Sequence, residues 1–184
     1  WDQLEKANLF LQGVIDTSDR PMDDKTVDWL FANPLSDGGQ YTGISENIMK
    51  YGVVPVEVMV DTYSAANTSK MRNLISLEDG LELRDMIAGG AKKGDVEKRK
   101  VAMLGEVYRM LVLNLGEPPA EFTWTRKDES GKIIDTRTYT PQSFYAEYAG
   151  NDLKNDYVML MNDPTREYCK VYEIDYDRHN YDGK

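Results

Sequence analysis

The sequence predicts an α+β chain that is mostly helical and that carries a few short antiparallel strands. Between residues 1 and 115, apolar side chains recur every three or four positions in several segments, which is the spacing of amphipathic helices. Between residues 121 and 139 the pattern changes to alternation, which is typical of paired strands. A chain of 184 residues is long enough to bury an ordinary core, as one domain or as one domain with part of another.

The composition excludes several classes of partner. The formal net charge is -10 at pH 7, so a nucleic acid would be repelled unless a basic patch overrode this charge. The only basic cluster, AKKGDVEKRK, is diluted by Asp95 and Glu97. No apolar run approaches the roughly 20 residues of a membrane span. We therefore expect neither a nucleic-acid nor a membrane partner, and the single cysteine excludes an internal disulfide framework.

The first helix is predicted at the very start of the chain. Its apolar residues share one face up to about Asp16, and Thr17 and Ser18 end the helix. This face consists of Leu4, Ala7, Leu11, Val14 and Ile15. The pattern opens at Trp1 without a residue that caps a helix, so we expect that the chain was cut from a longer protein.

Two shorter helices are predicted next, over about residues 25–32 and 44–51. The stretch YGVVPVEVMV, residues 51–60, is predicted to be extended, because Pro55 disfavours a helix and β-branched residues dominate. Two long helices are then predicted over about residues 68–87 and 95–115. The glycines at 89 and 90 end the first of them, so the pair is expected to form an antiparallel helical hairpin.

Strands are predicted in the last third of the chain. FTWTR and IIDTRTY are expected to pair across the turn DESGK. Thr140 then caps a short helix over residues 141–148, with proline at its first position. Two further strands, YVMLMN and CKVYEID, are predicted before a polar tail.

Two residues are candidates for a nucleophile and its base. Cys169 and His179 are the one cysteine and the one histidine, and an imidazole that accepts a thiol proton generates the attacking thiolate. Cys169 lies in a predicted strand without a helix N-terminus that would activate a thiol, and His179 lies in the polar tail. We therefore expect that neither is catalytic. The chain contains no metal-binding or nucleotide-binding motif, so we expect no metal and no cofactor.

The loop NPLSDGGQYTG, residues 33–43, contains two adjacent glycines, although one glycine is enough for a turn. Gly38 and Gly39 either turn the chain into the next helix or leave the backbone open to the close approach of a ligand. From the residues alone, the turn is the simpler explanation.

Six segments, taken in order, resemble the bleomycin hydrolase and aminopeptidase C family of papain-like cysteine peptidases. They are WDQLEKANLFL, NPLSDGGQ, MKYGVVP, LGEPPAEFTW, TPQSFYAEY and VMLMNDP, and they cover nearly the whole chain. The resemblance implies a fragment of a papain-like fold. In this fragment, residues 1–63 form part of the helical lobe, residues 64–140 form a helical insertion with a β-hairpin, and residues 141–184 return incompletely toward the core.

The resemblance also implies a role for the glycine pair. In papain-like folds such a pair lines the substrate cleft, where a peptide pairs with the bare backbone as an extended strand. Carried over by motif, Asp37, Gly38, Gly39 and Gln40 are the candidate substrate-binding residues, and the substrate is a peptide. With this context the cleft is favoured over the turn. Tyr41 stands where the family often has tryptophan.

The family's catalytic residues are expected to lie outside this chain. Its nucleophile belongs to a glycine-rich segment that leads into Cys-Trp, and its histidine and asparagine lie in segments that this sequence lacks. The implied function is a segment of a cysteine aminopeptidase that is inactive alone. The alternative is a non-catalytic binding or assembly module of papain-like descent. The family further implies a cytoplasmic homohexamer, although an export signal would be lost with a missing N-terminus.

Overall fold

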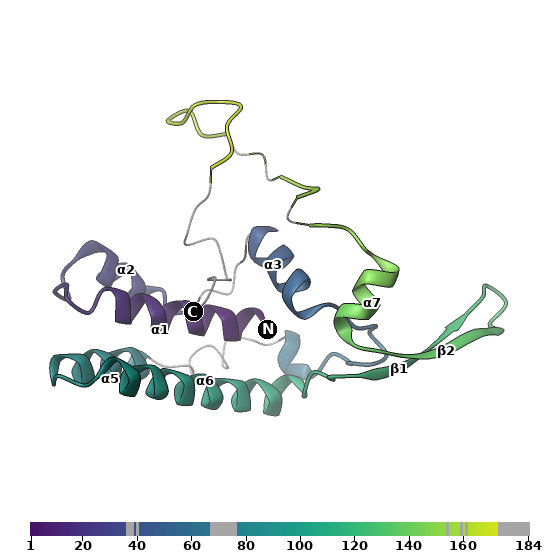
Figure 1. Cartoon of the computed structure of the whole chain (residues 1–184), viewed down its shortest axis with the longest axis horizontal. Coiled ribbons are helices and arrows are strands. Elements are labelled where there is room, and N and C mark those ends of the chain that lie inside the picture. The colour runs from purple at the N-terminus through teal and green to yellow at the C-terminus, as the bar shows by residue number, and fades with distance from the viewer. Residues whose placement is uncertain are drawn as a thin grey trace. The chain divides into compact units, whose positions relative to one another are not determined.

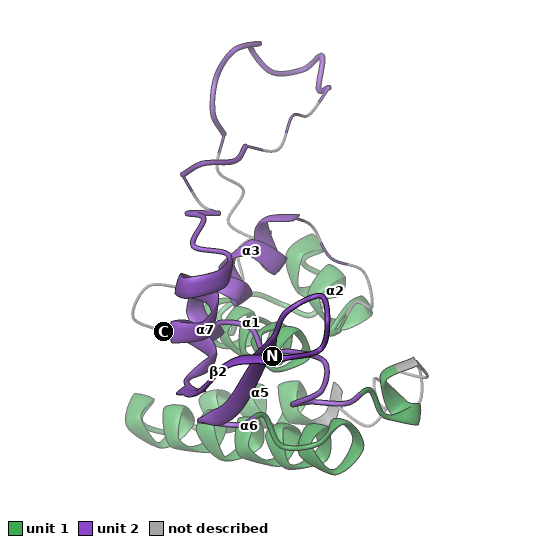
Figure 2. Cartoon of the chain, turned by 90° about the vertical axis from the view of Figure 1, so that its right-hand side faces the viewer, with its two compact units in different colours: residues 1–38, 61–118 green, residues 39–60, 119–184 purple. Residues whose placement is uncertain are grey.

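The computed structural model describes residues 1–35, 39, 41–66, 77–153, 155–158, 160 and 162–172. The chain forms two compact units, and each combines two stretches that are far apart in the sequence (Figures 1 and 2). Unit 1 consists of Trp1–Gly38 and Asp61–Pro118, and unit 2 consists of Gly39–Val60 and Pro119–Lys184. The predicted division at residues 63 and 140 concerns the larger papain-like architecture and stays a prediction.

Unit 1 is helical. Its elements are α1 (Asp2–Asp16), α2 (Lys25–Ala32), a 3-10 turn η1 (Tyr63–Ala66), α5 (Leu77–Ala88) and α6 (Lys93–Leu115). α1 packs along both α5 and α6 (Figure 1). The helical hairpin of α5 and α6 was predicted, and it provides the surface on which the apolar face of α1 is buried.

The core of unit 1 lies between these three helices. One cluster of buried side chains comprises Phe10, Leu11, Val14, Leu83, Val96 and Met103, and a second comprises Ala7, Leu35, Val107 and Leu111. Leu104 packs against both clusters, so the core is continuous along α6. Each Val, Leu, Phe or Met side chain of these clusters contributes about 1.5–3 kcal/mol when it is fully buried. Lys100 is also buried, and its Nζ donates a hydrogen bond to Oε1 of Gln12 at 2.8 Å.

Local capping signals set the helix ends. Oδ1 of Asp24 accepts hydrogen bonds from the backbone N–H groups of Thr26 and Val27, at 2.9 and 3.3 Å, and begins α2. Gly90 has φ +81°, and the N–H of Ala91 donates to the carbonyl of Met86, which ends α5. These ends agree with the predicted helix over residues 25–32 and with the predicted glycine stop.

Unit 2 contains α3 (Tyr41–Tyr51), the strands β1 (Phe122–Lys127) and β2 (Ile133–Tyr139), and α7 (Pro141–Tyr148). The strands are antiparallel, with Phe122 opposite Tyr139 and Trp124 opposite Arg137. Because side chains alternate along a strand, Phe122, Trp124, Arg137 and Tyr139 share one face of the hairpin. Among the described residues this is the only sheet, so the predicted α+β class with mostly helix and short antiparallel strands is confirmed.

Phe144 of α7 holds the hairpin to the helix. Its ring lies 5.5 Å from Phe122, 5.2 Å from Trp124, 5.5 Å from Tyr139 and 4.7 Å from Tyr148, measured between ring centroids. Three of these contacts are edge-to-face, the arrangement in which the positive edge of one ring meets the negative face of another. The aromatic alternation of the two strands therefore serves packing within unit 2.

Some predicted elements differ from the structure. α3 begins at Tyr41 rather than at residue 44. The helix predicted from residue 68 is described only from Leu77 onward, since residues 67–76 lie outside the described ranges. The stretch 51–60 is not continuously extended, because the N–H of Val58 donates to the carbonyl of Pro55 and closes a turn.

The two strands predicted in the tail were wrong for the residues that the structure describes. Residues 157, 158, 160 and 162 and residues 169–172 have no strand assignment. β-branched and aromatic residues favour a strand only where a neighbouring strand completes the backbone hydrogen bonds. In the described part of the tail no such partner is present.

Candidate functional site

The predicted substrate-binding residues fall largely outside the described part of the chain. Asp37, Gly38 and Gln40 lie outside the described residues, and Gly39 is the described member of the set. Gly39 is exposed, and a Cβ atom placed on it would meet no heavy atom within 4 Å. Its φ also lies outside the left-handed region. Neither a close contact nor the backbone conformation therefore requires glycine at this position.

α3 follows Gly39 closely, and its C-terminal end is held against α7. Gly52, the residue after α3, has φ +74°, and a Cβ atom on it would lie 2.2 Å from the carbonyl carbon of Pro141. The N–H of Val53 donates to the carbonyl of Pro141 at 3.2 Å. Nε2 of Gln142 donates to the carbonyl of Lys50 at 3.3 Å. These contacts join two segments that are separated by about ninety residues in the sequence.

The other end of α3 contacts the segment that follows α7. The ring of Tyr41 lies 6.4 Å from the ring of Tyr157, between centroids. The hydroxyl of Tyr145, in α7, donates to the carbonyl of Asn151 at 2.5 Å. Burial raises the pKa of Tyr145, and Tyr41 and Asp152 add to this effect because a negative charge near a phenol disfavours its ionisation. α3 is thus in contact with other parts of unit 2 at both of its ends.

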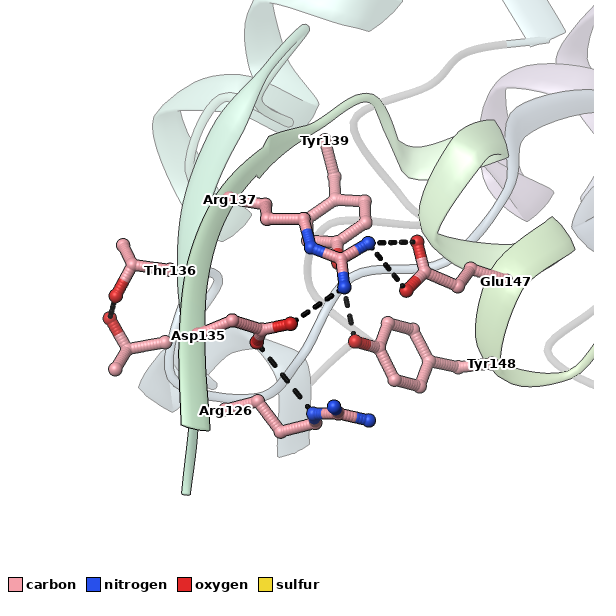
Figure 3. A network of polar contacts seen from close by, with 8 residues as sticks. Arg126, Asp135, Thr136, Arg137, Tyr139, Glu147 and Tyr148 are labelled. Carbon is pink, nitrogen blue, oxygen red and sulfur yellow. Dashed lines mark hydrogen bonds and ion pairs between the residues drawn. The ribbon is translucent and has the colours of Figure 1, made fainter. Parts of the chain in front are cut away.

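A network of ion pairs ties the hairpin to α7 (Figure 3). Nη2 of Arg137 donates to Oδ2 of Asp135 at 2.7 Å, and Nη1 donates to Oε1 of Glu147 at 3.1 Å. Nε of Arg126 lies 3.6 Å from Oδ1 of Asp135. Asp135 and then Glu147 raise the pKa of the Arg137 guanidinium above its ordinary value. Each carboxylate of this network has a cation beside it, so the network holds α7 against the hairpin.

Beside this network, the hydroxyls of Tyr139 and Tyr148 lie 3.2 Å apart. The hydrogen bond with Tyr148 raises the pKa of Tyr139 to about 12, and burial in the aromatic cluster acts in the same direction. Tyr139 therefore remains neutral in the physiological range, and both tyrosines contribute to packing.

Of the two residues considered as a nucleophile and its base, the structure describes one. Cys169 is a free, exposed thiol in a turn with φ +60°, so its predicted strand is wrong. His179 lies outside the described residues. The expectation that neither residue is catalytic stays a prediction.

Within the described ranges, no three side chains of His, Cys, Asp or Glu come together as metal ligands. In the same ranges, every helix is too short or too polar to cross a bilayer.

The contact of Gly52 with Pro141 was not predicted from the sequence. A glycine after a helix and a proline after Thr140 were each visible as local signals. Their pairing brings together residues about ninety positions apart, and local patterns in a single sequence carry no information on such pairing.

Comparisons of the sequence and of the structure with known proteins all match the chain to peptidases. A family profile described as the Peptidase C1-like family matches residues 1–184. Aminopeptidase C of Lactobacillus delbrueckii subsp. lactis is 37% identical over 181 residues, and bleomycin hydrolase of Homo sapiens is 32% identical over 185 residues. Each alignment covers 96% of this chain and 40% of the relative, so the chain spans less than half the length of these proteins.

A solved structure is also similar. A crystal structure of PepW from Lactobacillus rhamnosis aligns with a TM-score of 0.79 and 39% sequence identity. The alignment covers 83% of this chain and 35% of the PepW chain.

Proposed function

Because the chain belongs to the peptidase C1-like family, we propose that it is the substrate-cleft segment of a cysteine aminopeptidase. Such an enzyme hydrolyses N-terminal residues from peptides by attack of a thiolate on the scissile carbonyl. The relatives named aminopeptidase C support this activity, and their greater length supports the view that the present chain contributes one part of the enzyme.

The observation that carries the proposal is the family match, which covers residues 1–184 and so includes the DGGQ loop. Gly39 agrees with a cleft role, because it is exposed and a Cβ atom on it would meet no heavy atom of the described residues within 4 Å. A bare backbone of this kind is suited to an extended peptide, which pairs with it as an added strand. Asp37, Gly38 and Gln40 are proposed to act beside Gly39 on the same substrate.

No catalytic residue is assigned to this chain. A thiolate nucleophile needs an imidazole within hydrogen-bond reach and a set of donors for the oxyanion. Cys169 lies in an exposed turn. We therefore place the nucleophile, its base and the oxyanion hole outside residues 1–184, and the chain alone is expected to be inactive.

Gly39→Leu in the complete enzyme tests the proposal. The leucine side chain would cover the backbone that holds the substrate, so kcat/KM for an aminoacyl substrate should fall about tenfold, which corresponds to about 1.4 kcal/mol. This is the loss expected from one or two backbone hydrogen bonds at about 0.5–1.5 kcal/mol each. Folding should hardly change, since no heavy atom lies within 4 Å of the new Cβ.

Gly94→Leu is the matched control, because Gly94 is likewise exposed, has no heavy atom within 4 Å of a Cβ, and has no left-handed φ. Its kinetic constants should match those of the unmodified enzyme. If Gly39→Leu also left the constants unchanged, Gly39 would not belong to the cleft.

A further inference from the structure

We infer that residues 163–172 form a docking loop: its exposed Tyr168 and Val171 pack on an apolar surface in the part of the complete peptidase that lies outside residues 1–184. The structure describes every residue of this loop. The inference rests on the proposed function, since it takes the chain as one part of a longer enzyme. The alignments with aminopeptidase C and bleomycin hydrolase cover 40% of each relative, so most of such a protein lies outside the chain.

The first half of the loop is closed by its own polar groups. Oδ1 of Asp163 accepts hydrogen bonds from the N–H and from the hydroxyl of Thr165, at 2.9 and 2.6 Å. Oδ2 of Asp163 accepts one from Nε of Arg166 at 3.0 Å. The hydrogen bonds from Thr165, followed by the charge of Arg166, lower the pKa of Asp163, so its carboxylate is ionised at neutral pH and holds this turn.

The second half is closed by Tyr172. Its hydroxyl accepts a hydrogen bond from the N–H of Glu167 at 3.1 Å and donates one to the carbonyl of Glu167 at 3.3 Å. The guanidinium of Arg166 lies over the Tyr172 ring, with Cζ 5.0 Å from the centroid, as in a cation–π contact. Lys170 forms an ion pair with Glu167. Contacts within the loop therefore fix its conformation.

The apolar side chains of the loop are left in water. Tyr168 is 67% exposed and Val171 is 86% exposed, while the polar groups around them pair with one another. Water favours the opposite arrangement, in which apolar groups are covered. One exposed apolar residue is ordinary, but Val158 and Leu160, which are 70% and 92% exposed, lie shortly before the loop in the sequence. Such a concentration of exposed apolar side chains indicates an interaction surface.

The rest of the same polypeptide is the occupant that fits these observations. A segment joined to its partner by the chain does not lose the translational freedom of a separate molecule, and a loop that is already ordered loses little conformational entropy on docking. A second copy of the chain would carry the same net charge of -10, and this charge opposes self-association. Tyr168 has the residue type that most often anchors an interface, with an apolar ring and a hydroxyl that needs a hydrogen-bond partner.

Hydrogen exchange of the loop amides tests the inference. It is measured by mass spectrometry on the 184-residue chain and on the complete product of its reading frame. The amides of residues 163–172 should exchange about tenfold more slowly in the complete product, because docking must be reversed before they open to water. Equal exchange of these amides in the two proteins would overturn the inference.

Val171→Asp in the complete product tests the contact itself. It places a charge on the docked surface, so loop exchange should return to within about twofold of the rate in the chain alone. Val101→Asp is the matched control, because Val101 of α6 is also mostly exposed, at 67%, and lies outside the loop. It should leave loop exchange unchanged.

Tyr168→Ala is a milder variant should Val171→Asp not fold. It removes the proposed anchor and should speed loop exchange in the complete product about threefold or more. Loop protection that persisted unchanged in the loop variants that fold would overturn the inference.

Other outcomes separate the inference from its alternatives. If the loop of the 184-residue chain were already protected and lost this protection on dilution, a second copy would be the occupant and the inference would be overturned. If the complete product hydrolyses aminoacyl substrates but its loop exchanges as in the chain alone, the proposed function stands and the docking role fails. If its loop is protected but it hydrolyses no such substrate, the docking role stands and the proposed activity fails.

Discussion

At the scale of single residues, the pKa of Tyr139 depends on the packing of unit 2. Its pKa is raised from 10.0 to about 12, first by the hydrogen bond with Tyr148. Between these two pH values the unfolded chain releases the proton while the folded chain keeps it. The stability that Tyr139 contributes is therefore complete below pH 10 and is lost as the pH rises toward 12.

Tyr148→Phe tests this assignment. The variant removes the hydroxyl partner, so the late-ionising tyrosine should shift toward its ordinary pKa in a titration followed by the ultraviolet absorbance of tyrosinate. Tyr168→Phe is the control, because it removes an exposed tyrosine from another part of the chain. If the two variants gave the same high-pH titration, the contact between Tyr139 and Tyr148 would not be responsible for the shift.

Cys169 provides a second test at this scale. Cys169→Ala in the complete enzyme should leave kcat/KM within about twofold, since substitutions of exposed residues away from a site have small effects. In the unmodified chain, the exposed thiol should react readily with a thiol reagent under native conditions. Complete loss of activity in Cys169→Ala would place the nucleophile inside this chain and contradict the proposed function.

At the scale of elements, α5 packs closely on both α1 and α2. A Cβ on Gly80, in α5, would lie 2.8 Å from Cζ of Phe10 and 3.1 Å from Cε1 of Phe31. These two rings pack edge to face, with 5.7 Å between centroids, and Phe10 is buried. The rings cannot withdraw without loss of packing in the core.

Gly80→Ala should therefore lower the free energy of unfolding by about 1–3 kcal/mol through overpacking, although alanine favours a helix. Gly105→Ala is the matched control in α6, where no heavy atom lies within 4 Å of a Cβ and the residue is exposed. It should raise the free energy of unfolding by about 1 kcal/mol through helix propensity alone. Urea denaturation measures both, and equal effects of the two variants would contradict the close packing of α5.

The sequence predicted those elements whose signals are local. The Gly89–Gly90 stop and the Thr140-Pro141 start both act within one helical turn, and each was recognisable from residue type. The β-hairpin was equally clear, since both strands and their turn lie within 18 consecutive residues, from Phe122 to Tyr139. The tail strands failed because a strand depends on a partner, and residue composition does not supply one.

The candidate site was predicted less completely. The glycine pair was recognisable in the sequence as a candidate ligand contact. Only the structure shows that a side chain would have space at Gly39 and would clash with Pro141 at Gly52. Both are glycines near the ends of α3, but Gly52 has a positive φ and a close neighbour in Pro141, which lies far along the chain. Sequence patterns report the conformation that a residue favours, and they do not report which distant segment approaches it.

At the scale of the whole molecule, each of the two units is assembled from stretches that are not consecutive. Unit 1 joins Trp1–Gly38 to Asp61–Pro118, and unit 2 joins Gly39–Val60 to Pro119–Lys184. Within unit 1, α1 of the first stretch packs on α5 and α6 of the second, and within unit 2, α3 of the first stretch packs on α7 of the second. The fold of each unit therefore depends on both of its stretches.

The central claim is that this chain carries the substrate cleft, and not the catalytic groups, of a cysteine aminopeptidase. The most direct measurement is hydrolysis of an aminoacyl nitroanilide by the 184-residue chain and by the complete product of its reading frame, each with and without a thiol-blocking reagent. We predict no hydrolysis by the chain alone and thiol-sensitive hydrolysis by the complete product. Thiol-sensitive hydrolysis by the chain alone, or none by the complete product, would contradict the account.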